Sequence, residues 1–136
     1  MLRRVLGVVA GFLAFIIIVT AGNRVLRLVW PDYAAVEKAM TFSLAMLLAR
    51  LALSFAATVM SGWVAAVVGK KAQSAWLLGI LWLVIFAPLH LLALWTKFPI
   101  WYHLVFLASL LPLSVWGAEW SGTAAERKFL AGGSET

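Results

Sequence analysis

Arg50 is the residue whose type and position say most about possible chemistry in this chain. It interrupts an otherwise apolar stretch that runs from about Met40 to Val68. A guanidinium inside a hydrocarbon layer costs about 2.5–3.5 kcal/mol on insertion scales, so it needs a polar partner or a water-filled cavity. Two interpretations stay open. Arg50 either snorkels or packs against carbonyl groups of a neighbouring helix, or it is a fixed positive charge in an outward-facing cavity that binds an anion or a lipid head group.

Four further polar residues lie at a similar depth if the apolar stretches span a membrane. His90 lies near the end of the third stretch, Tyr102 and His103 near the start of the fourth, and Asn23 closes the first. Ionisable groups inside a membrane are functional candidates by default. With Arg50, these four residues form a candidate intramembrane polar site, although similar depth does not establish that they face each other.

The two histidines allow a cofactor hypothesis. Facing side chains of helix bundles build haem and metal sites, so His90 and His103 on adjacent antiparallel helices permit a bis-histidine haem. The alternative is that each imidazole hydrogen-bonds a neighbouring helix. Two nitrogen ligands fall short of the three or four that metal sites use, and the chain has no cysteine. We therefore expect no metal site and no resident cofactor.

The sequence contains no recognisable catalytic motif. It has no glycine-rich phosphate loop, no HExxH, no GxSxG and no paired carboxylates within the apolar stretches. We therefore expect no catalytic residues and no enzymatic activity. The first-helix glutamate of small multidrug resistance transporters has no counterpart between Val5 and Thr20, which excludes that family.

Four apolar stretches must position these residues. The chain of 136 residues is 65% hydrophobic and 12% charged, whereas soluble proteins average about 45–50% apolar and about 25% charged residues. Each stretch is near the length of about 20 residues that crosses a bilayer, and backbone groups in lipid require helices. We predict an all-α polytopic membrane protein, a bundle of four transmembrane helices over about 5–29, 40–68, 75–96 and 100–120. Residues 1–120 form one domain, and 121–136 form a flexible polar tail.

Small residues predict how these helices pack. Helices in lipid associate where small side chains let their backbones approach closely. The candidates are a GxxxG pair in the first helix and a series in the second helix, which we expect to be central: Gly7, Gly11, Ala45, Ala49, Ala52, Ala56 and Gly62. Packing within the molecule and dimerisation with a second copy are both compatible with GxxxG. A homo-oligomer or a partner membrane protein is therefore possible.

The net charge of +6 is better explained by basic residues that flank membrane spans than by binding of nucleic acid. If both termini are cytoplasmic, the cytoplasmic side has more basic residues than the outer side. The cytoplasmic residues are Arg3, Arg4, Lys70, Lys71, Arg127 and Lys128, and the outer ones are Arg24, Arg27, Lys38 and Lys97. The first stretch also has features of a signal peptide, but its apolar run exceeds the usual length of about 7–15 residues, so we expect it to be retained.

One segment carries a family resemblance. Phe98-Pro99-Ile100-Trp101-Tyr102-His103-Leu104 opens the last helix after a short turn. This segment and the overall layout resemble small four-helix inner-membrane proteins that are widespread in bacteria and have no assigned activity. The resemblance implies a multi-pass protein of the bacterial inner membrane. We expect a non-enzymatic accessory or helix-interaction protein. The alternatives are a small oligomeric carrier or channel with Arg50 in an anion or lipid-head-group site, and a bis-histidine haem protein.

Overall fold

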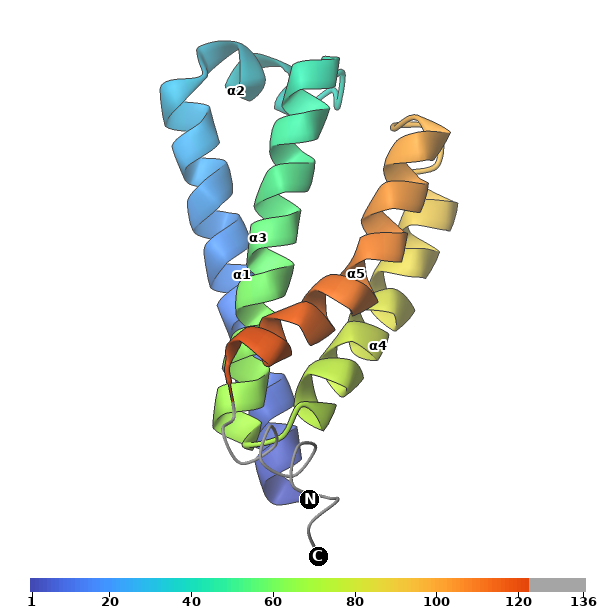
Figure 1. The fold of residues 1–136 in the computed structure, drawn as a ribbon. Helices are drawn as coiled ribbons and strands as arrows, with labels where there is room; N and C mark the ends of the chain where they lie inside the picture. Colours follow the sequence, from blue (N-terminus) through green and yellow to red (C-terminus); the bar gives the residue numbers. More distant parts are fainter. Residues whose placement is uncertain (123–136) are drawn as a thin grey trace, which may run out of the picture.

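The structure, a computed structural model, describes residues 1–122. Its elements are α1 (Leu2–Val29), α2 (Pro31–Glu37), α3 (Leu44–Gly69), α4 (Gln73–Pro88), a π-helical turn η1 (Leu89–Ala93) and α5 (Ile100–Trp120) (Figure 1). The predicted all-helical fold is confirmed. Four segments are long and apolar enough to cross a membrane: α1, α3, α4 continued by η1, and α5. The chain is thus a multi-pass membrane protein. The predicted tail, apart from a turn at Ser121 and Gly122, lies outside the described residues.

The helix that carries Arg50 begins later than predicted. Met40 has a positive φ of 54°, a left-handed conformation that interrupts any helix continuing from α2. Ser43 is extended, and its hydroxyl accepts a 3.4 Å hydrogen bond from the backbone N–H of Met46. This capping contact satisfies one of the free N–H groups of the first turn, so α3 starts at Leu44 and not near residue 40.

The third span ends in a π-helical turn. Pro88 lacks an N–H group and so leaves a carbonyl of the preceding turn without its usual partner. After it, the N–H of Leu94 donates a 3.1 Å bond to the carbonyl of Leu89, a wider spacing than in an α-helix. The span therefore stops at Ala93, short of the predicted residue 96. His90 lies within this turn and is buried.

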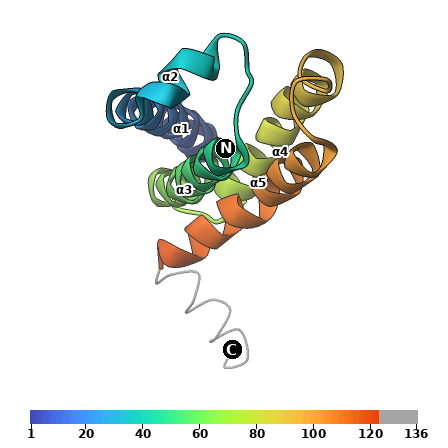
Figure 2. The ribbon, with the colours of Figure 1, turned by 90° about the horizontal axis from the view of Figure 1, so that it is seen from above.

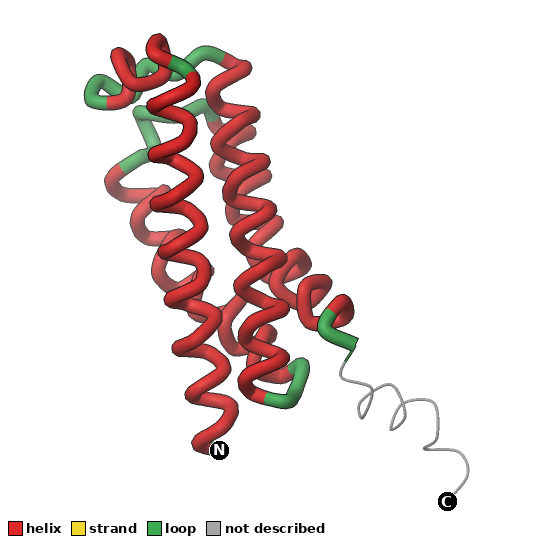
Figure 3. Tube along the Cα trace, turned by 90° about the vertical axis from the view of Figure 1, so that its left-hand side faces the viewer, coloured by secondary structure: helices red, strands yellow, loops and turns green. Residues whose placement is uncertain are grey.

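The helices form two antiparallel pairs, α1 with α3 and α4 with α5 (Figure 1). Viewed along the bundle, α2 lies across the end formed by the top of α1 and α3 (Figure 2). The N-terminus lies at the opposite end, beside the turn between α3 and α4 (Figure 3). Helix α5 contains Pro112 and bends near its middle, so that its C-terminal half crosses α3 (Figure 1). Helices α3 and α4 each contact the three other spans, and α3 makes the more extensive contacts, chiefly with α1 and α5, so it is the central helix.

Glycines make the closest helix contacts. A Cβ on Gly7 would lie 2.5 Å from the carbonyl oxygen of Ala65 and 2.8 Å from the Cα of Gly69. A Cβ on Gly62 would collide with the backbone of Ser114, where α5 crosses α3. Gly11 also faces α3, since its Cβ would lie 2.7 Å from the carbonyl oxygen of Ser61. The GxxxG pair is thus used within the molecule.

The prediction that the series Ala45, Ala49, Ala52 and Ala56 of α3 packs inside the bundle is wrong. Ala45, Ala52 and Ala56 are exposed and Ala49 is only half-buried. At about 100° per residue, these alanines lie on the side of the helix opposite to Leu47, Leu51 and Ala65, which are buried. Because both lipid and protein interior are apolar, small residues alone did not distinguish the two faces.

Candidate functional site

Arg50 lies in the second turn of α3, at the end of the bundle covered by α2. Its Nη1 donates a 2.6 Å hydrogen bond to the hydroxyl of Tyr33, which is fully buried. That hydroxyl in turn donates a 3.1 Å bond to Oδ1 of Asn23. Two hydrogen bonds thus connect α3, α2 and α1 through side chains alone.

The guanidinium also lies against aromatic rings from two connecting segments. Its Cζ is 4.7 Å from the ring centroid of Phe42 and 5.9 Å from that of Phe98, within cation–π range. These two rings stack on each other with centroids 6.0 Å apart. Tyr102 stacks on Phe98 with ring centroids 4.8 Å apart. The positive charge therefore lies among aromatic faces and phenol groups.

Arg50 is nearer to the end of its span than the sequence suggested. Because α3 begins at Leu44, the Arg50 Cα lies about 9 Å from the helix start at the rise of about 1.5 Å per residue. Among residues 1–122, no carboxylate forms an ion pair with Arg50, and its buried Nε has no hydrogen-bond partner. Glu37 pairs with Arg27 instead, with Nε and Oε2 2.6 Å apart. The hydrogen bond from Arg27 holds the pKa of Glu37 below its ordinary value.

The two histidines hydrogen-bond to each other. Their Nδ1 atoms are 2.8 Å apart, and Nε2 of His103 is 3.3 Å from the carbonyl oxygen of Trp95. A carbonyl only accepts, so Nε2 of His103 carries a proton. In a neutral ring its Nδ1 then accepts, and Nδ1 of His90 donates. His90 stacks on Phe106 at 4.5 Å and His103 on Trp95 at 5.2 Å.

This geometry differs from that of paired axial ligands. At metal–nitrogen distances of about 2.0–2.1 Å, two nitrogens on opposite sides of one metal ion stand about 4 Å apart. The Nδ1 atoms of His90 and His103 are in direct hydrogen-bond contact instead. Within residues 1–122, no group of three or more His, Cys, Asp or Glu side chains is placed to hold a metal ion.

The structure brings the five predicted polar residues together. Asn23 joins Arg50 through Tyr33, and the ring of Tyr102 stacks on that of His90 with centroids 6.4 Å apart. Tyr102 thus lies between the Arg50 group and the histidine pair. Sequence reasoning missed the contributions of Tyr33, Phe42 and Phe98. Each of these flanks a span, where aromatic residues are expected as interface anchors, so their type gave no reason to connect them with Arg50.

Four hydroxyl groups of the spans donate hydrogen bonds to backbone carbonyls. Ser114 donates a 2.8 Å bond to the carbonyl of Ala75, which connects α5 to α4. Thr58, Ser61 and Ser109 each donate to a carbonyl of their own helix. Of these four contacts, only that of Ser114 joins two helices, as the Arg50 and histidine groups also do.

Comparison of the chain with protein-family models, with curated proteins and with solved structures finds no match. The class that fold and composition define is an all-helical, multi-pass membrane protein whose polar side chains connect its helices near one end of the bundle.

Proposed function

We propose that this chain is a non-enzymatic accessory protein of a bacterial inner membrane. It acts through helix contacts, by packing α3 against a transmembrane helix of another protein or of a second copy. The observation that carries this proposal is the alanine face of α3, defined by Ala45, Ala49, Ala52 and Ala56, which the fold leaves open to the outside.

The alanine face has the properties of a helix-docking surface. Its residues repeat at alternating spacings of four and three. This is the heptad spacing of residues that contact a second helix packed alongside the first. Small side chains let backbones approach, which is the main source of helix association in lipid. Elsewhere the outer surface carries bulky residues, such as Ile17 on α1 and Leu104 on α5, exposed by 66% and 62%.

An apolar groove continues the alanine face along α3. It has a volume of about 370 Å³ and lies between α3 and the bent half of α5. Its walls are entirely apolar and aromatic and include Ala56, Met60, Trp116 and Trp120. A partner helix on the alanine face would therefore also find a recess for its own larger side chains.

Co-purification tests this proposal. The full-length tagged chain, extracted in mild detergent, is expected to retain one stoichiometric partner or a second copy. Ala52→Phe fills the alanine face and should abolish that recovery, whereas Ile17→Phe, a matched change at an exposed site on α1, should not. Recovery of a lone monomer, or equal recovery by both variants, would contradict the proposal.

The proposed orientation places both termini in the cytoplasm. It is supported by the excess of basic residues on that side, including Lys70 and Lys71 between α3 and α4. Because the chain has no cysteine, single substitutions report sidedness directly. A membrane-impermeant maleimide should label Lys38→Cys in intact cells and Lys71→Cys only after permeabilisation. The reverse pattern would invert the orientation.

A second candidate function is a small oligomeric carrier or channel in which Arg50 binds an anion. It is favoured by the buried, unpartnered Nε of Arg50 and by the lack of an ion pair to this residue among the described residues. In liposomes, Arg50→Leu should abolish anion flux while Arg24→Gln, which removes an exposed charge, leaves it intact. A parent protein without flux, or an unchanged Arg50→Leu variant, would exclude this function.

A further inference from the structure

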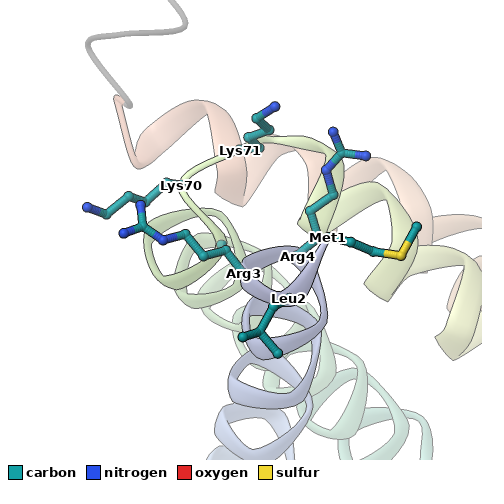
Figure 4. Close-up of a pocket in the computed structure, with 7 residues that line it drawn as sticks. Met1, Leu2, Arg3, Arg4, Lys70 and Lys71 are labelled. Atoms are coloured by element: carbon teal, nitrogen blue, oxygen red, sulfur yellow. The ribbon is translucent and has the colours of Figure 1, made fainter.

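A basic cavity lies at the end of the bundle opposite to Arg50. It is open to the outside, lies between the first turn of α1 and the turn between α3 and α4, and has a volume of about 320 Å³. Arg3, Arg4, Lys70 and Lys71 line it (Figure 4). In this view the side chains of Arg3 and Lys70 extend to one side, and those of Arg4 and Lys71 to another. Two segments far apart in the sequence therefore supply two pairs of cations.

Close helix packing builds this cavity. Gly7 and Gly69 bring the ends of α1 and α3 together, because a Cβ on Gly7 would lie 2.8 Å from the Cα of Gly69. Lys70 follows at once with a positive φ of 56° and ends α3. The turn thereby directs Lys70 and Lys71 to the start of α1. Without the two glycines, the helix ends would be held further apart.

Four basic side chains and no acidic ones line the cavity among the described residues. Within residues 1–122, none of these four side chains forms an ion pair, and no acidic residue lies in the first turn of α1. That turn also has no side-chain cap, so its leading backbone N–H groups point outward with the positive end of the helix dipole. The cavity is thus complementary to an anion with several acceptor oxygens.

We propose that this cavity binds a phosphate group, supplied by the head group of an anionic phospholipid. Basic pockets between transmembrane helices at the cytoplasmic surface suit such head groups. The position supports a lipid source, since the cavity lies where two spans end and Leu2 beside it is 73% exposed, available to an acyl chain. Free inorganic phosphate shares the chemistry and is the alternative source.

Lipid titration of the purified full-length protein tests this site. The protein in a neutral detergent is titrated with fluorescent phosphatidylglycerol and, separately, with phosphatidylcholine of the same chain length. We expect clear preference for phosphatidylglycerol. The double variants Arg3→Gln/Arg4→Gln and Lys70→Gln/Lys71→Gln should each bind it about tenfold more weakly or worse. The control Arg24→Gln/Lys97→Gln, with the same charge removed at exposed sites elsewhere, should bind as the parent does.

Each contrary result has a definite meaning. Equal binding of the two lipids, or parent-like binding by Lys70→Gln/Lys71→Gln, overturns the site. Equal weakening in the control variant shows general charge attraction and also overturns it. Displacement of the lipid by millimolar inorganic phosphate assigns the cavity to the free ion and overturns the lipid source. Because lipid reaches the protein from all sides in detergent, the result is independent of the proposed orientation and of the partner of α3.

Discussion

The Arg50 guanidinium donates a 2.6 Å hydrogen bond to the hydroxyl of Tyr33, and this contact fixes α2 across the end of the bundle. Tyr33 lies only two positions beyond Pro31, which starts α2, so the short helix is held by a side chain in its first turn. The same hydroxyl donates to Asn23 of α1. The hydroxyl of Tyr33 therefore connects the charged side chain of Arg50 on α3 with the neutral side chain of Asn23 on α1.

Tyr33→Phe tests this connection. The substitution keeps the ring but removes the acceptor of Arg50 and the donor to Asn23, so stability should fall by about 0.6–1.7 kcal/mol, the range for side-chain hydrogen bonds between membrane helices. Reversible unfolding in mixed micelles measures the change. Asn23→Ala in the Tyr33→Phe background should add little, because its partner is already gone. Fully additive losses would contradict the connection.

Gly62→Ala should be one of the most damaging small changes in the chain. The added methyl would meet the backbone of Ser114, which has no freedom to rotate away, so α3 and α5 must separate. Overpacking of this kind costs about 1–3 kcal/mol. Thermal unfolding followed by circular dichroism measures it. Gly22→Ala is the matched control, since the atoms nearest to its methyl belong to the flexible side chain of Leu53. Equal effects of the two substitutions would argue against a tight crossing.

The contact between α1 and the end of α2 should weaken in acid. The pKa of Glu37 is lowered by the hydrogen bond from Arg27, so the ion pair stabilises the fold above the ordinary glutamate pKa of 4.5. That contribution is lost as the pH falls through the lower pKa of the folded state. The protection factors of α2 amides, which are corrected for the intrinsic pH dependence of hydrogen exchange, should fall over this acidic range in the parent. In Glu37→Gln these protection factors should not change with pH there, and a retained change would assign it to another group.

The histidine pair should behave as one unit. His90→Leu leaves Nδ1 of His103 buried without its partner, a loss of about 1–3 kcal/mol. The double variant His90→Leu/His103→Leu should cost less than the sum of the single changes, because no imidazole is then left unpaired. A double-mutant cycle on unfolding free energies gives the coupling. Strict additivity would mean that the two rings do not share a hydrogen bond.

The spans could be predicted because the properties that define them belong to each segment of the sequence by itself. Length, apolar content and the need to satisfy backbone groups in lipid define Ile100–Trp120 within the sequence itself, and the structure has the same bounds. The later start of α3 depends on the positive φ of Met40 and the cap at Ser43. A serine within an apolar flank gave no reason to expect either.

The faces of the helices and the partners of Arg50 could not be predicted in the same way. In a soluble protein, the buried face of a helix is apolar and the exposed face is polar. In lipid both faces of α3 are apolar. The residues of the alanine face were therefore predicted to be buried, although they lie on the outer face. The depth of Arg50, His90, His103, Tyr102 and Asn23 followed from their positions in the spans. The contacts with Tyr33, Phe42 and Phe98 arise from connecting segments folded back over the bundle, which no periodicity describes.

Photo-crosslinking from the alanine face is the most direct test of the proposed helix interaction. A photoreactive amino acid replaces Ala52 in the full-length chain in cells, and the same group at Ile17 serves as the control on an exposed surface of α1. Irradiation should give one discrete protein adduct from position 52 and none from position 17. Adducts with lipid alone at position 52, or the same protein adducts at both positions, would contradict the proposal that α3 docks a partner helix.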